Sequence, residues 1–373
     1  LGLAILIPLI AFFILYEGFV FLRAGNAAKW VITLVAIIWG VGGIAILYYV
    51  FNWLVEQLPL EWTLRLQPFV FVGPAIAMLI WFLALPAVRT LYLSLFGRNG
   101  PPDVPLSMLF TSPGAYFAAL STQFVGLQNY ADVFTNRLML TAFRNNILFW
   151  IGIATPLTVI TGLLVAVLAD RSKFERVAKS LIFMPMAISF VGASVIWNFI
   201  YEVNAPDQPQ IGLLNAIVVA LGGQPHGWTN YITIAPWNNL FLVIIVVWLQ
   251  AGYAMVLFSA AIKGIPEEII EAARVDGANE LQVFFRIMIP YIMGTIITVT
   301  TTIIIFTLKI FDVVWVMTGG QFGTDVIATQ FYRQSFTNRN SGYGSALAII
   351  LLVAIIPVMI YNLRQIREEE AFR

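Results

Sequence analysis

Long apolar stretches constrain this chain more than any other feature. Eight segments are apolar over the roughly 20 residues that a helix needs to cross a hydrocarbon core of about 30 Å. They span residues 3–22, 30–51, 69–95, 146–169, 181–200, 240–262, 291–311 and 345–363. Only 10% of the residues are charged, against roughly a quarter in a soluble domain. The sequence therefore predicts an all-α, polytopic membrane protein with about eight transmembrane helices in a lipid bilayer.

The composition excludes several kinds of chemistry. Because the chain has no cysteine, it can form no disulfide, thiolate nucleophile or cysteine-ligated metal site. A single histidine, His226, leaves almost no room for histidine-based metal or general-base chemistry. The net charge of +1, without a basic block, argues against a nucleic-acid partner. We therefore predict neither catalytic nor metal-binding residues.

The chain also lacks nucleotide-binding chemistry. No G-x-x-x-x-G-K-[ST] phosphate loop occurs, and the glycines of "GVGG" at residues 40–43 lie inside an apolar span without phosphate-loop spacing. We expect this chain to bind no cofactor, so any ATP and Mg²⁺ must be held by a different polypeptide.

The distribution of Lys and Arg favours one orientation in the membrane. With residues 271–290 placed in the cytoplasm, the inner side carries eleven of these residues and the outer side seven. The first hairpin runs against this bias, because Arg23 and Lys29 then lie outside. The bias predicts a cytoplasmic C-terminus and orients the last six spans, while the orientation of the first two spans stays open.

A charged run, "EAARVDGANELQVFFRIMIP" at residues 271–290, separates two of the apolar spans. Pro266 suits a first helical position, and Asp276-Gly277 suits a helix end, where glycine adopts the left-handed conformation. The run therefore predicts two short helices around a turn. From the residues alone, such a pair could lie on lipid headgroups or could fit a groove on a soluble partner.

The same run resembles the EAA signature of permease subunits of binding-protein-dependent ABC importers. That signature reads E-A-A-x-x-D-G-A and is followed by an aromatic residue and I-x-x-P. Its counterparts here are Glu271-Ala272-Ala273, Asp276-Gly277-Ala278, Phe284, Ile287 and Pro290. Three further stretches resemble the sugar-importing, maltose-type branch: "FVGLQNYADVF", "IGLLNAIVVALG" and "KIFDVVWVMTGG". The resemblance covers roughly residues 69–363.

The resemblance implies a type I ABC importer permease fold with three parts. Residues 1–67 would form an N-terminal two-helix membrane extension, residues 68–363 a six-helix permease core, and residues 364–373 a cytoplasmic tail. A coupling helix at residues 264–290 would fit a cleft of an ATP-hydrolysing subunit. Its ATPase-coupling residues would be Glu271, Ala272, Ala273, Asp276, Gly277 and Ala278.

The resemblance also implies partners and a location. We expect two ATP-binding subunits, a second permease subunit that completes a heterodimer, and an extracytoplasmic solute-binding protein. The location would be the bacterial plasma (inner) membrane, in which this chain is a multi-pass protein.

Polar and aromatic residues inside the spans are candidates for a solute path. Trp248, Gln250 and Tyr253 lie within two helical turns. Such residues suit a sugar, with an aromatic face for its C–H groups and amides for its hydroxyls, but they are also common packing and interface residues in membranes. Lys309 and Asp312 have the spacing of an ion pair, and one of them could instead line the path.

Similarity to the maltose-type subunit narrows these candidates. It points to a substrate path formed by Trp248, Leu249, Tyr253, Thr302 and Lys309. Where that subunit has asparagines in its seventh span, this chain has Phe306 and Lys309, which leaves the identity of the sugar open.

These observations together predict a function and leave alternatives. The expected function is that of a non-catalytic transmembrane subunit of an ATP-driven importer for a carbohydrate, either an oligosaccharide or a glucoside. A non-sugar solute such as a polyol or glycerol phosphate is the first alternative. A secondary transporter would need paired acidic or histidine residues at the midplane and repeated halves, and a membrane enzyme would need a histidine or carboxylate cluster.

Overall fold

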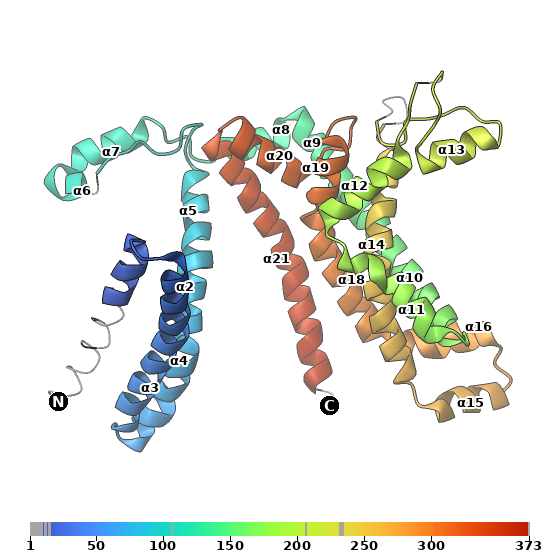
Figure 1. Ribbon diagram of the computed structural model, residues 1–373, viewed down its shortest axis with the longest axis horizontal. Helices are drawn as coiled ribbons and strands as arrows, with labels where there is room; N and C mark the ends of the chain where they lie inside the picture. The colour runs from blue at the N-terminus through green and yellow to red at the C-terminus, as the bar shows by residue number, and fades with distance from the viewer. Residues whose placement is uncertain are drawn as a thin grey trace. The chain divides into compact units, whose positions relative to one another are not determined.

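The computed structural model describes residues 10, 13, 16–105, 107–205, 207–230 and 235–371 (Figure 1). These residues form helices and connecting loops, and their only β-type pairing is an isolated bridge between Phe96 and Phe124. The all-α prediction is therefore confirmed. The chain forms two compact units, Leu1–Arg89 and Thr90–Arg373, whose boundary lies inside the predicted third span.

The structure contains most of the predicted spans. In the part of the chain that the structure describes, four helices are long and apolar enough to cross a membrane: Leu60–Leu93, Arg137–Asp170, Asn239–Lys263 and Ser341–Gln365. Two bent helix pairs raise the number to six in the described residues. The second predicted span corresponds to the apolar helix Lys29–Gly42 and its continuation to Glu56. Much of the first, residues 3–22, lies outside the described residues.

The first unit consists of helices with little buried surface. Its elements are α2 (Lys29–Ile37), η1 (Ile38–Gly42), α3 (Gly43–Glu56), α4 (Leu60–Leu79) and η2 (Ile80–Ala84), followed by the start of α5 (Leu85–Leu93). α3 and α4 form a hairpin, in which the Tyr48 hydroxyl donates to the carbonyl of Phe71 at 2.9 Å. None of the side chains in the apolar window of the Leu60–Leu93 helix is buried, so this surface is left to lipid or protein neighbours.

The predicted fifth span, residues 181–200, is not a straight helix. It comprises α11 (Glu175–Phe183), the 3₁₀ turn η4 (Met184–Ala187) and α12 (Phe190–Tyr201), with a bend of 103°. Pro185 lies in the turn and has no N–H to continue the α-helical ladder. The side chain of Ser189 then caps α12 by accepting from the N–H of Gly192 at 3.0 Å.

The core of the second unit is built around α14 (Asn239–Lys263), which packs along α10 (Thr155–Asp170). A Cβ added at Gly162 would lie 2.4 Å from the Cβ of Ala254, and one at Gly252 would lie 2.6 Å from the carbonyl oxygen of Ile182. Small residues let helix backbones approach closely in membranes, where dispersion replaces the hydrophobic effect as the packing force. α14 contributes to two of the three buried apolar clusters of this unit.

The second unit has two distinct ends (Figure 1). At one end, called the α13 end, lie α8 (Gln128–Thr135), α9 (Arg137–Asn145), α12, α13 (Leu213–Ala220), α19 (Asp312–Thr318) and α20 (Ile327–Tyr332). At the other, called the α15 end, lie α15 (Glu267–Val275) and α16 (Glu280–Val283). Connecting elements are η3 (Asn146–Ala154), η6 (Phe284–Met288), α17 (Ile289–Tyr291), α18 (Met293–Leu308), η7 (Arg333–Thr337) and α21 (Ser341–Ala371); the described residues also include α6 (Ser107–Thr111) and α7 (Pro113–Ser121).

Candidate coupling segment and solute path

The segment between α14 and α18 contains the two short helices that the sequence predicts. Pro266 precedes α15, and Glu267 and Glu268 lie in its first turn, where negative charge complements the helix dipole. α16 continues through η6 and α17 as one helix, and a bend of 70° separates it from α18. Pro290 therefore lies inside the second short helix, before the bend, and does not itself open the seventh span.

The turn between α15 and α16 is closed by its own backbone. Gly277 has φ +85°, and the N–H groups of Gly277 and Ala278 donate to the carbonyls of Arg274 (3.0 Å) and Ala273 (2.9 Å). This is the Schellman arrangement that ends helices at a left-handed residue. No atom of the described residues lies within 4 Å of a Cβ added at Gly277, so the requirement for glycine is conformational and not steric.

Asn279, the residue after this turn, caps the start of α16. The side chain of Asn279 accepts from the N–H of Gln282 at 2.9 Å, and the side chain of Gln282 accepts from the N–H of Asn279 at 2.8 Å. This capping box satisfies two backbone donors that the helix start would leave without partners. The turn and the cap together define the connection between α15 and α16 through hydrogen bonds within the segment itself.

The coupling residues that the sequence predicts divide between two faces. Ala273 and Ala278 pack against the buried cluster that contains Val283 and Met288. The other four, Glu271, Ala272, Asp276 and Gly277, are exposed. Beside them the exposed face carries apolar side chains, with exposed fractions of 87% for Val275, 70% for Leu281 and 63% for Phe285. An exposed apolar surface at the end of a helix bundle is typical of a contact site.

Ion pairs connect this segment to the neighbouring helices. Glu280 accepts from Arg274 of α15 at 3.0 Å and from Arg171, which follows α10, at 2.9 Å. A second cluster joins α10, α11 and α14: Lys179 contacts Asp170 and Glu175, and Lys263 contacts Glu175. Two of these pairs, Arg171–Glu280 and Lys263–Glu175, join residues that are 109 and 88 positions apart along the chain, so the sequence does not show them. The other pairs join residues that are 4 to 9 positions apart.

The predicted solute-path residues have different surroundings. Trp248 is half-buried, and its ring meets that of Trp197 edge-on at 5.8 Å. Tyr253 is half-buried, and Thr302 and Lys309 are exposed on or just after α18. Leu249, by contrast, is 2% exposed and belongs to a buried cluster, so in this conformation it is a packing residue.

Lys309 and Asp312 do not form the ion pair that their spacing predicts. No contact of 4.0 Å or less joins their charged groups among the described residues. The reason is a break in the helix, because α18 ends at Leu308 and Asp312 opens α19. The spacing rule holds only inside one continuous helix. Both side chains are exposed.

Aromatic rings gather where α12, α14 and α18 meet. Trp197 contacts Tyr201 and Trp248, Tyr201 contacts Phe241, and Phe190 of α12 stacks on Phe306 of α18 at 4.9 Å. The indole N–H groups of Trp150, Trp197 and Trp228 are buried and have no hydrogen-bond partner in the described residues. This region combines apolar ring faces with unused hydrogen-bond donors.

A partly buried loop at residues 319–326 joins α19 to α20, with Gly320 and residues 324–326 buried. Asn145 donates to the carbonyls of Gly323 (2.7 Å) and Asp325 (2.8 Å), and Asn238 donates to that of Phe322 at 2.8 Å. Asn146 accepts from the N–H of Ile327, just after the loop, at 3.0 Å. Side chains from α9, η3 and the start of α14 thus replace the backbone partners that an irregular segment lacks. These asparagines have no local signature in the sequence, so their contacts could not be predicted from it.

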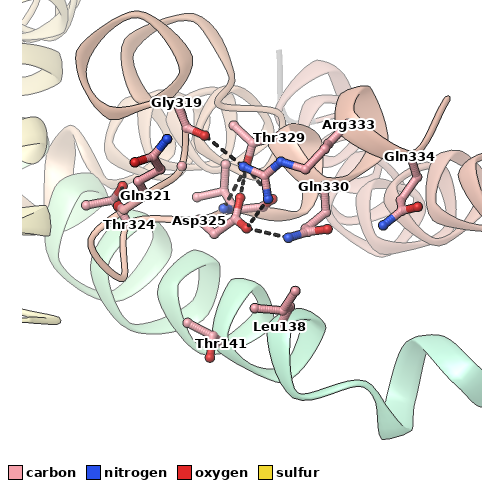
Figure 2. Close-up of polar contacts among 12 residues, drawn as sticks. Leu138, Thr141, Gly319, Gln321, Thr324, Asp325, Thr329, Gln330, Arg333 and Gln334 are labelled. Carbon is pink, nitrogen blue, oxygen red and sulfur yellow. Dashed lines mark hydrogen bonds and ion pairs between the residues drawn. The ribbon is translucent and has the colours of Figure 1, made fainter. Parts of the chain in front are cut away.

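An ion pair between Asp325 and Arg333 joins the same loop to η7. Asp325, 5% exposed, accepts from Thr329, Gln330 and, at 3.1 Å, Arg333. Arg333 also donates to the carbonyl of Gly319 at 2.8 Å (Figure 2). A buried carboxylate therefore has a guanidinium partner and two further donors, as burial of a charge requires.

Comparison with known proteins decides the family. Residues 147–367 match the model of the family "Binding-protein-dependent transport system inner membrane component". The chain belongs to this family. It is 48% identical to the osmoprotective compounds uptake permease protein GgtC of Synechocystis sp. over 81% of this chain and 100% of that protein. It is 45% identical to the alpha-glucoside transport system permease protein AglF of Rhizobium meliloti over 82% of this chain and 83% of that protein.

The fold of this permease has solved counterparts. A bacterial alginate ABC transporter, crystallised with an alginate pentasaccharide-bound periplasmic protein, matches with a TM-score of 0.63 and 18% identity over 79% of this chain and 92% of that one. The predicted permease fold and the resemblance carried by the EAA signature are confirmed. The chain is a multi-pass membrane component of an ABC transporter, and the secondary-transporter alternative is not supported.

Proposed function

We propose that this permease imports a carbohydrate, an oligosaccharide or a glucoside, into the cytoplasm of a bacterium. The aromatic region between α12, α14 and α18 carries the proposal. Ring faces at Trp197 and Trp248 suit the C–H faces of a sugar, and buried indole N–H groups without partners suit its hydroxyl oxygens. Two relatives whose names specify an alpha-glucoside and lactose agree with this substrate class.

The solute path in this proposal uses four of the predicted residues. Trp248 and Tyr253 would contact the sugar from α14, while Thr302 of α18 and Lys309, directly after its end, would line the path with exposed side chains. Thr298 and Thr302 are four residues apart on α18, so they share one helix face, and Lys309 directly follows the end of this helix. Polar groups on a membrane helix face are expensive unless they meet a cavity or a partner. Leu249 would act behind this surface, by packing.

Energy would come from partner subunits. Two ATP-binding subunits would hold ATP and Mg²⁺ and receive the α15–α16 pair through its exposed face, which carries Glu271, Val275 and Gly277. A second permease subunit would complete the path, and a solute-binding protein would deliver the sugar at the α13 end. The C-terminus would then lie in the cytoplasm. A rigid, capped helix pair suits this role because it transmits a rigid-body movement.

The experiment is sugar uptake by the complete assembly in proteoliposomes, with candidate sugars and the co-encoded binding protein. An alpha-glucoside should stimulate both ATP turnover and uptake. Trp248→Ala should lower uptake at least tenfold, whereas Trp62→Ala, an exposed tryptophan of the first unit, should leave it unchanged. Stimulation only by a polyol or glycerol phosphate, or unchanged uptake in Trp248→Ala, would contradict the proposal.

A further inference from the structure

An open hollow of about 390 Å³ lies in the second unit, between α8 and the turn into α21. Its lining is polar: Asp132, Thr135, Asn136, Gln334, Asn340 and Tyr343. The size lies within the range of small-molecule sites. The hollow is separate from the aromatic region of α12, α14 and α18, because none of its lining residues comes from those helices.

One buried polar group in this hollow lacks a hydrogen-bond partner in the described residues. Tyr343 is 8% exposed, yet its hydroxyl has no hydrogen-bond partner in the described residues. Buried hydroxyls without partners are costly and therefore rare in folded proteins. Because the residue lines the hollow, a molecule bound there could supply the missing partner.

The amides around Tyr343 present their donors. The amide oxygen of Asn136 accepts from the N–H of Leu138, that of Gln334 from the side chain of Asn338, and that of Asn340 from the N–H of Tyr343. Each of these three side chains therefore keeps an NH₂ group with no partner among the described residues. Asp132 adds acceptors, since Gln128 engages only its Oδ1 atom, at 2.7 Å.

We propose that this hollow binds a ring of the transported sugar before it reaches the solute path; this inference rests on the proposed function. Three NH₂ groups and a phenol hydroxyl meet the oxygens of a polyhydroxylated ligand, and the carboxylate of Asp132 accepts one of its O–H groups. The lining has no cation for an anionic ligand. Tyr343 is the one aromatic side chain among these lining residues, and it is 8% exposed, so the hollow does not offer the cluster of apolar anchors that forms the centre of a protein-docking site.

The test uses the complete assembly in lipid nanodiscs, without the binding protein and with maltose as the probe. All proteins carry Trp248→Ala, so that the proposed path does not contribute. Saturation-transfer NMR should show maltose binding. Tyr343→Phe removes one oxygen and Asp132→Asn keeps the shape, and each should weaken binding roughly five- to tenfold. Tyr361→Phe and Asp103→Asn, at exposed positions, are matched controls and should leave binding unchanged.

Three results would overturn the proposal. They are no maltose signal in the Trp248→Ala protein, equal dissociation constants in all variants, and variants that weaken association of the binding protein while maltose binding stays the same. The last result would make the hollow a protein contact. Uptake by the protein with Trp248 intact tests the proposed function independently, so the two ideas can fail separately.

Discussion

Two irregular segments of this permease join helices in opposite ways. The loop at residues 319–326 is partly buried, and its carbonyls accept hydrogen bonds from asparagines and from Arg333 of other elements. The turn at residues 276–279 is exposed, and it is held by Gly277, Ala278 and the Asn279 cap within the segment itself. The loop is held by side chains from other helices, whereas the turn is held by hydrogen bonds within its own segment.

The difference follows from the surroundings of each segment. A backbone carbonyl away from water must find a protein donor, so a buried loop is tied to the helices around it. An exposed turn can leave carbonyls to water and needs only its local caps. The loop at residues 319–326 is therefore held by contacts to several other elements, while the turn between α15 and α16 is formed by local hydrogen bonds.

The largest effect is expected at the buried ion pair. Arg333→Met leaves the carboxylate of Asp325 buried without its guanidinium, which should cost about 3–5 kcal/mol of unfolding free energy. Thermal and denaturant unfolding in detergent measure the loss. The double variant Asp325→Asn/Arg333→Met should recover much of it. A loss below about 1 kcal/mol in the single variant would show that the loop does not depend on this contact.

A smaller loss is expected from the asparagines. Asn145→Leu removes both donors to the carbonyls of Gly323 and Asp325 and should destabilise the protein by about 2–3 kcal/mol. Asn338→Leu, at an exposed position, is the control and should change stability by about 0.5 kcal/mol or less. Equal unfolding free energies for the two variants would remove the contrast between the two segments.

A substitution at Gly277 should impair the coupling of ATP hydrolysis to uptake. A β-branched residue is strained at φ +85°, so Gly277→Val should cost about 1–2 kcal/mol locally and change the angle between α15 and α16. We expect uptake to fall strongly while ATP turnover persists, as parallel assays would show. Gly277→Asn, which tolerates this conformation better, should keep most of the uptake. Wild-type uptake in the valine variant would contradict a coupling role for the turn.

The smallest effect is expected at the cap of α16. Asn279→Ala removes one half of the capping box and should cost about 1 kcal/mol. Hydrogen exchange should show the loss at the first amides of α16 only, because the turn does not depend on distant elements. Faster exchange spreading to residues 319–326 would mean that the two segments are not independent.

The sequence predicts helix caps and turns well, but it predicts contacts between residues far apart in the chain poorly. Pro266, Gly277 and the E-A-A-x-x-D-G-A pattern place the short helices because their signals lie within one or two turns. The bend after α11 and the break after α18 were missed, since both interrupt apolar runs that read as single spans. Asn145 binds carbonyls 178 and 180 residues away, a distance that no local pattern encodes.

The most direct measurement is cross-linking from the exposed face of α15. The chain has no cysteine, so Val275→Cys introduces a unique thiol at a position that is 87% exposed. In the complete assembly, a short bifunctional reagent should link this thiol to an ATP-binding subunit, and a thiol at Phe110, 85% exposed on α6, should give no such product. A Val275→Cys protein that cross-links to no ATP-binding subunit, while still supporting uptake, would contradict the coupling role of the α15–α16 pair.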